Sequence, residues 1–115
     1  MTTLTQGNQT GEFLLSQANG TRSREEVTIS SAAGAMIAGT VLAKLDADGK
    51  YVEYDDVGTD GTQTAAGILY ADVANSASDQ KAVIIARDAE VDSALLTGYN
   101  ANAKADLAAL GIIVR

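Results

Sequence analysis

The sequence predicts a mainly β domain with one short helix near the C-terminus and an extended arm at the N-terminus. Short apolar segments follow one another at close intervals and are separated by glycine-containing turns. Two Asp-Gly pairs, at 48–49 and 60–61, supply the positive φ angles that tight hairpin turns need. An alanine-rich stretch at 102–110 is the late segment that favours a helix.

The first twelve residues are rich in Thr, Gln, Asn and Gly, and Met1 and Leu4 are their large apolar residues. Such a composition buries too little apolar surface to offset the entropy that is lost on ordering. We therefore divide the chain into a flexible N-terminal arm, residues 1–25, and a β-rich domain, residues 26–115.

A short apolar cluster interrupts the arm, with a polar residue on each side of it: Glu12, Phe13, Leu14, Leu15 and Ser16. The next apolar segment along the chain begins at Val27. Because the cluster has no apolar neighbour in the sequence, we expect it to have little to pack against. Residues 1–16 should then contribute little to the stability of the folded domain.

The first strands of the domain follow from alternation and turn residues. Residues 27–30 alternate apolar and polar, which places Val27 and Ile29 on one face of a strand. Glycines interrupt the alanine-rich residues 32–39, so we expect a loop there. Residues 40–45 and 50–54 then form a hairpin around the first Asp-Gly turn.

Two further strands are expected at 66–73 and 81–87. The second is a continuous apolar run of the kind that is buried on both faces. The helix at 102–110 can be capped by Asn100 or Asn102, and Gly111 can close it. Residues 112–114 form a terminal strand.

Composition excludes several classes of function. The 115 residues include no cysteine and no histidine, which rules out disulfides, thiolate zinc sites and Ser-His-Asp triads. Eight basic and fifteen acidic residues give a net charge of −7, the wrong sign for binding nucleic acid. No apolar run approaches the ~20 residues that a membrane span needs. The sequence thus indicates a soluble binding or structural module with no catalytic residue and no cofactor.

The acidic hairpin at residues 43–60 is the candidate metal site. Asp46 and Asp48 precede a glycine, as ligands do in calcium loops, but an EF-hand needs its glycine sixth and a glutamate twelfth. Here glycine is fourth, and the twelfth position, counted from Asp46, is Val57. We therefore interpret the segment as an acidic turn and expect no metal site.

Five segments, read in order, carry a family resemblance: residues 11–16 (GEFLLS), 37–44 (IAGTVLAK), 65–69 (AAGIL), 82–91 (AVIIARDAEV) and 110–114 (LGIIV). In this combination the chain resembles the lambda-type head decoration proteins of tailed bacteriophages, over about residues 11–115. Each segment is a weak signature alone, and their order is what is specific.

This resemblance implies a β-clip-like domain that assembles as a homotrimer. Trimers of the family sit at three-fold and quasi-three-fold positions outside the expanded capsid and clamp the major capsid protein against DNA pressure. The family's arm orders on the capsid, a role that would fall here on Glu12, Phe13, Leu14, Leu15 and Ser16. The protein would be made in the host cytoplasm, be found on the virion exterior, and bind neither nucleic acid nor membrane.

The alternative is a small β-barrel carrier or nucleotide hydrolase of related shape. A carrier needs an attachment lysine at a hairpin tip, and Lys50 lies beside the first Asp-Gly turn without a flanking pattern that supports modification. A hydrolase needs a phosphate or metal site. Phosphate release from nucleotides, set against co-pelleting with capsids, discriminates the two functions.

Overall fold

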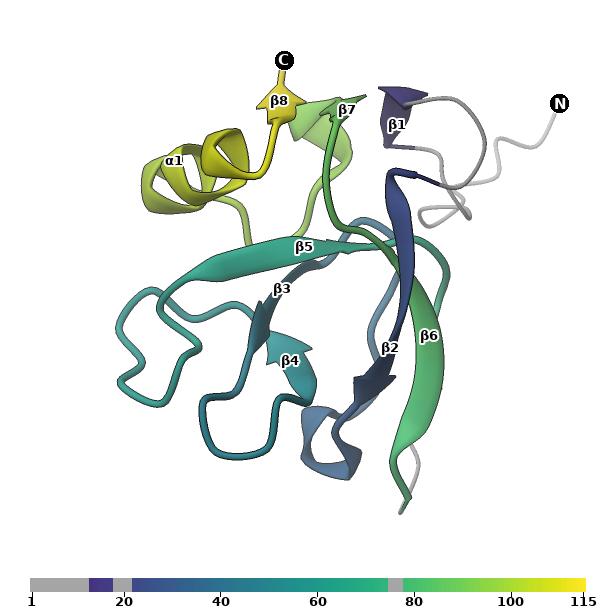
Figure 1. Ribbon diagram of the computed structural model, residues 1–115, viewed down its shortest axis with the longest axis vertical. Coiled ribbons are helices and arrows are strands. Elements are labelled where there is room, and N and C mark those ends of the chain that lie inside the picture. The colour runs from purple at the N-terminus through teal and green to yellow at the C-terminus, as the bar shows by residue number, and fades with distance from the viewer. Residues whose placement is uncertain (1–12, 18–21, 75–77) are drawn as a thin grey trace, which may run out of the picture.

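The computed structural model describes residues 13–17, 22–74 and 78–115. These residues form a closed β-barrel with a smaller sheet and one α-helix beside it (Figure 1). The predicted mainly β class with a short C-terminal helix is therefore confirmed. Within the described residues, no helix is long and apolar enough to cross a membrane.

The barrel contains five strands in the order β2-β4-β3-β5-β6. Their bounds are β2 Arg24–Ile29, β3 Val41–Lys44, β4 Tyr51–Glu53, β5 Ala65–Leu69 and β6 Gln80–Ile85. Neighbouring strands are antiparallel except β2 and β4, which are parallel. β2 and β4 pair only through Ile29 and Tyr51, so among the described residues that edge of β2 has no strand partner over residues 24–28.

A three-stranded sheet lies at one end of the barrel, in the order β1-β7-β8. Its strands are β1 Leu14–Gln17, β7 Ala89–Val91 and β8 Ile112–Val114. β1 pairs antiparallel with β7, and β8 pairs parallel with it. The parallel crossover carries the 3-10 helix η2 Ser93–Leu95 and the helix α1 Ala101–Ala109, and a second 3-10 helix, η1 Ser31–Ala33, follows β2.

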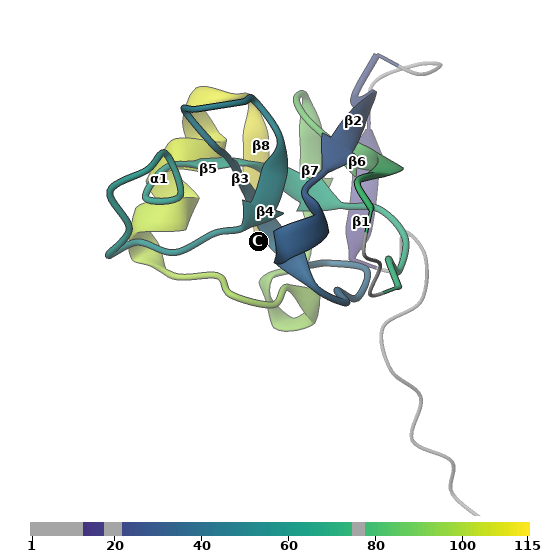
Figure 2. The ribbon, with the colours of Figure 1, turned by 90° about the horizontal axis from the view of Figure 1, so that it is seen from below.

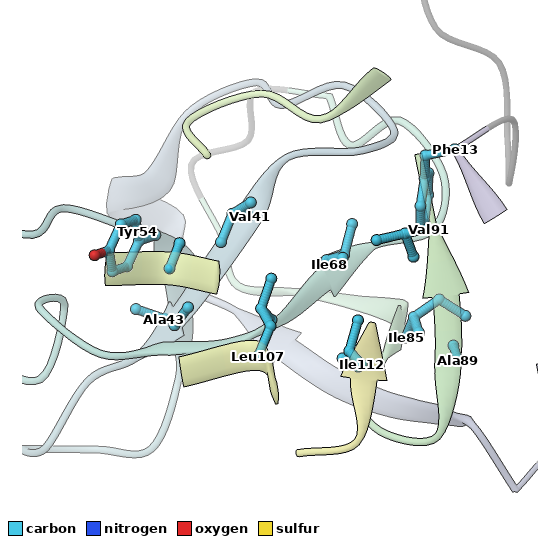
Figure 3. Close-up of a cluster of buried hydrophobic side chains, with 12 residues drawn as sticks. Phe13, Val41, Ala43, Tyr54, Ile68, Ile85, Ala89, Val91, Leu107 and Ile112 are labelled. Carbon is cyan, nitrogen blue, oxygen red and sulfur yellow. The ribbon is translucent and has the colours of Figure 1, made fainter. Parts of the chain in front are cut away.

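Two apolar clusters form the core because β3, β5 and the last two residues of β6, Ile84 and Ile85, are buried on both faces. Side chains alternate along a strand, so consecutive residues enter different clusters. One cluster is formed by Val27, Ile29, Met36, Leu42, Leu69, Val73, Ile84 and Ala86. The other joins the barrel to the smaller sheet and α1, and includes Phe13, Val41, Ile68, Ile85, Val91, Leu107 and Ile112 (Figure 3).

The local signals place their elements correctly. Gly49 has φ 71° in the β3–β4 turn, and Gly61 has φ 103°. The side chain of Asn100 caps α1 by accepting a hydrogen bond from the amide of Ala103, and Gly111 has φ 81° just after the helix. The hairpin, the helix and both of its end signals are thus confirmed.

The expectation for β6 is wrong in its first half. Ile84 and Ile85 are buried on opposite faces, but Lys81 is exposed and Val83 is 38% exposed. The lower parts of β2 and β6 extend past the smaller sheet, so nothing described covers their outer face there (Figure 1). An apolar run predicts burial on both faces only where two layers flank the strand.

Candidate functional site

β1 carries three of the five predicted binding residues, Leu14, Leu15 and Ser16, and it lies at an edge of the smaller sheet. It pairs with β7 through Leu14↔Val91, Ser16↔Glu90 and Gln17↔Ala89, with an irregularity at Leu15. The amide of Asp92 donates a 2.8 Å hydrogen bond to the carbonyl of Phe13. Among the described residues the other side of β1 has no strand partner. Such an edge can pair with a strand of another protein.

Phe13 corrects the expectation that this segment has little to pack against. Its side chain is 1% exposed and lies in the cluster with Val91, Ile68 and Ile112 (Figure 3). The partners were invisible in the sequence because β7 and β8 come about 75 and 100 residues later in the chain. Phe13 therefore packs as part of the folded domain.

The remaining predicted residues divide by exposure. Leu14 is half-buried against the same cluster, whereas Leu15 is 53% exposed and Ser16 is exposed. Glu12 lies outside the described residues. Leu15 and Ser16, near the start of β1, are thus the predicted binding residues that are exposed among those the structure describes.

Glu90 is a residue of this site that sequence reasoning missed. Its carboxylate accepts hydrogen bonds from the Ser16 hydroxyl (2.9 Å) and from Nε (3.2 Å) and Nη2 of Arg115. The Arg115 guanidinium, followed by the Ser16 hydroxyl, lowers the pKa of Glu90 below its ordinary value. One carboxylate therefore ties β1 and the C-terminal residue to β7. No local pattern links these three positions, which the fold alone brings together.

Two carboxylates of the acidic hairpin, residues 43–60, accept hydrogen bonds from residues two positions later in the chain. Asp48 Oδ1 accepts a hydrogen bond from the amide of Lys50 at 3.0 Å, and Asp60 Oδ1 accepts one from the hydroxyl of Thr62 at 2.7 Å. No group of three or more metal-type side chains is gathered among the described residues. These carboxylates act in the way that Asp acts in tight turns generally, by bonding nearby backbone and hydroxyl groups.

The family model described as bacteriophage lambda head decoration protein D matches residues 3–112. The chain belongs to this family. The match runs from before β1 into β8, so it includes the barrel, the smaller sheet and α1. No individual curated protein matches the chain. Head decoration proteins are structural components of the phage capsid, so this decoration protein has a structural role in the virion capsid.

Proposed function

We propose that this decoration protein binds the major capsid protein on the outside of the expanded phage head. In this proposal it binds as homotrimers at three-fold and quasi-three-fold positions and stabilises the head against DNA pressure. It performs no catalysis and needs neither cofactor nor metal. It joins the head during assembly in the host cytoplasm and remains on the virion exterior, contacting neither nucleic acid nor membrane.

The edge strand β1 is the observation that carries the proposal. Leu15 and Ser16 are exposed on β1, and residues 1–12 precede this strand in the sequence. A strand with a free edge can gain main-chain hydrogen bonds with a partner strand, while an exposed leucine adds apolar contact. The described part of the segment is already held on the domain by Phe13, so binding needs little further ordering there.

Three copies of this segment in one trimer would act together. Each segment is short and exposes little apolar area, so a single contact should be weak. Linking three such contacts makes the second and third binding events intramolecular and raises the overall affinity. We therefore assign capsid binding to residues 1–12 with Leu15 and Ser16, and we assign Phe13 and Leu14 to anchoring.

The test measures occupancy of expanded, undecorated capsids against protein concentration. One variant lacks residues 2–12 and retains Phe13, and a second carries Leu15→Asp. Both should need at least about tenfold more protein for half-occupancy, since a polar substitution at a binding contact removes over 1 kcal/mol. The matched control is Ile113→Asp, because Ile113 is 51% exposed on β8 at the other edge of the same sheet.

The outcomes separate clearly. Normal capsid occupancy by both variants would show that neither β1 nor residues 2–12 contribute to binding, and that another face of the protein binds the capsid. Equal losses for Leu15→Asp and Ile113→Asp would indicate a general effect of surface charge. Failure of the unmodified protein to decorate capsids at any concentration would overturn the proposed function itself.

A further inference from the structure

β2 has a free edge over most of its length. Its contact with β4 pairs Ile29 with Tyr51, and among the described residues no strand pairs with residues 24–28 on that side. In Figure 2 the hairpin of β3 and β4 lies on this side of β2, and β6 lies on the other side. A groove runs along the free edge, and across from residues 25–28 it is lined by Lys44, Asp48, Gly49, Lys50 and Tyr51. The wall of the barrel is therefore open along this part of β2.

The main chain of β2 directs hydrogen-bonding groups into this groove. The carbonyl of Ser23 accepts a 2.8 Å hydrogen bond from the amide of Ala86, the residue after β6, so the main chain of Ser23 faces β6. Along a strand of an antiparallel pair, these directions alternate from one residue to the next. Arg24 and Glu26 therefore direct their amides and carbonyls toward the groove, as Ser30 does in donating to β4 at 3.0 Å. An extended segment laid against this edge would pair with these groups.

The side chains of the groove favour an uncharged segment. Both signs of charge are interspersed along it, in the acids Glu25, Glu26 and Asp48 and the lysines Lys44, Lys50 and Lys81. A segment with several charges of one sign would therefore lie beside groups of its own sign. The half-buried ring of Tyr51 adds apolar area to the groove. The groove thus fits a neutral, extended segment with an apolar residue in it.

Residues 3–6 (TLTQ), which precede the described residues, have this chemistry. Residues 1–11 include no charged side chain. Thr3 and Thr5 are β-branched, a residue type that is enriched in strands, and Leu4 between them is apolar. Gly7 then interrupts the run. The sequence therefore contains, outside the described residues, one short segment suited to the groove.

The connection of this segment to the domain is long enough for it to reach β2 of the same chain. Phe13 packs in the same cluster as Ile85, and Ile85 pairs with Arg24 at the start of the free edge. Residues 7–12 can span about 20 Å when extended, whereas neighbouring strands lie about 4.8 Å apart. Because Gln6 is the end of the segment nearer to Phe13, it lies toward the start of β2, and the segment runs antiparallel to the strand.

We propose that residues 3–6 add to the free edge of β2 of their own chain in the free protein, with Leu4 opposite Val27. Opposed residues of an antiparallel pair share a face, so Leu4 lies on the side of β2 that carries the apolar Val27. The inference rests on the proposed function in one respect, because the same residues are assigned there to capsid binding. Docking on β2 therefore competes with the capsid, and the segment leaves β2 when the protein binds.

The chain has no cysteine, so an engineered disulfide tests the pairing. In the full-length variant Gln6→Cys/Glu25→Cys the two positions oppose each other in a non-hydrogen-bonded pair, whose Cα separation of about 4.5 Å suits a disulfide. Mild oxidation should give a disulfide within one chain, detected by intact mass and by faster migration on a non-reducing gel. Disulfides formed chiefly between chains, or none at all, would overturn the inference.

The matched control is Gln6→Cys/Lys81→Cys. Lys81 is exposed on β6, on the far side of β2 from the groove. Its disulfide should form at least about tenfold more slowly, because a docked segment presents its cysteine at a high effective concentration only to the nearer strand. Equal rates of oxidation for the two variants would show that the segment has no preferred place, and would overturn the inference.

Two substitutions at Glu26 distinguish main-chain pairing from side-chain contact. Both remove the carboxylate, but Glu26→Pro also removes the amide that faces the groove, while it leaves the hydrogen bonds between β2 and β6 in place. In the Gln6→Cys/Glu25→Cys variant, Glu26→Pro should slow oxidation at least about fivefold relative to Glu26→Ala, because the strand pairing is lost. Urea unfolding checks that the barrel is intact in both. Equal oxidation rates would overturn the inference.

Capsid decoration measures the competition. The oxidised Gln6→Cys/Glu25→Cys protein should need at least about tenfold more protein for half-occupancy of expanded capsids than the same protein after reduction. Equal occupancy in the two states would overturn the competition between β2 and the capsid. Failure of the unmodified protein to decorate capsids would overturn the proposed function and leave the disulfide result standing, so the two failures are distinguishable.

Discussion

The hydroxyl of the buried Ser23 donates a 2.8 Å hydrogen bond to the carbonyl of Asp88, 65 residues later in the chain. The contact joins the start of β2 to the turn between β6 and β7, where Asp88 has a φ of 50°. The main chain adds a second link at the same place, because the amide of Ala86 donates a 2.8 Å hydrogen bond to the carbonyl of Ser23. The barrel and the smaller sheet are therefore fastened together at this point.

Ser23→Ala should destabilise the fold by about 1–3 kcal/mol, because it removes the hydroxyl that donates to the carbonyl of Asp88 in a partly buried hydrogen bond. Urea unfolding of the variant measures the loss. Thr59→Ala is the control, since Thr59 is exposed and a surface change of this kind stays within about 0.5 kcal/mol. A neutral Ser23→Ala would mean that water replaces the hydroxyl at no cost.

Gly61→Ala should be far more damaging than Gly34→Ala. Both glycines have positive φ, at 103° and 73° respectively. A Cβ at Gly61 would lie 2.4 Å from the carbonyl oxygen of Lys44, whereas one at Gly34 would meet nothing within 4 Å. We expect roughly 1–2 kcal/mol at Gly34 from φ alone, and a greater loss at Gly61, where backbone must move. Equal free energies of unfolding for the two variants would contradict the close approach.

Leu107→Ala should cost about 2–5 kcal/mol, since the side chain is fully buried between α1 and the barrel. Leu110 is half-buried at the end of the same helix, and its replacement by alanine should cost less. Thermal or urea unfolding of the two variants gives the comparison. A larger effect at Leu110 would show that the helix end, rather than its buried face, fastens α1.

Elements defined by neighbouring residues were predictable from the sequence. The Asp-Gly turns, the Asn100 cap and Gly111 act within a few residues of the elements they start or end, so their signals are local. The exposed half of β6 was not predictable in this way. An apolar run shows that a strand has side chains suited to burial on both faces. Whether another layer covers each face depends on the tertiary fold.

The candidate site shows the same division. The sequence identified the segment around Leu15 as apolar and the structure exposes that side chain, but the sequence could not distinguish it from Phe13 two residues earlier. Phe13 packs in the cluster that contains Val91 of β7, far along the chain, whereas the pairing of β1 with β7 is irregular at Leu15. The roles of Glu90 and Arg115 likewise depend on pairings that no sequence window contains.

Glu90 should make stability depend on pH in the acid range. Its pKa in the folded protein lies below the ordinary value of 4.5, chiefly through the hydrogen bond from Arg115. The carboxylate therefore stabilises the fold above that ordinary value, and the contribution is lost as the pH falls and the group is protonated. Glu90→Gln should lower the melting temperature near neutral pH, and its difference from the natural protein should shrink on acidification.

The control for this measurement is Glu26→Gln, on β2. No described residue pairs with the Glu26 carboxylate, so its replacement should change the melting temperature little at any pH. A gap between Glu90→Gln and the natural protein that stays constant from neutral to acid pH would contradict the ion pair with Arg115.

Phe13 and Leu15 should separate folding from binding. Phe13 is 1% exposed in the cluster that joins the barrel to the smaller sheet, so Phe13→Ala should cost about 3–5 kcal/mol. Leu15 is 53% exposed, so Leu15→Ala should change the free energy of unfolding by less than about 0.5 kcal/mol while weakening capsid binding. Urea unfolding and capsid occupancy are measured on both variants. If Phe13→Ala leaves stability intact, β1 does not pack on the domain in solution, and the segment is the loose arm that composition alone suggested.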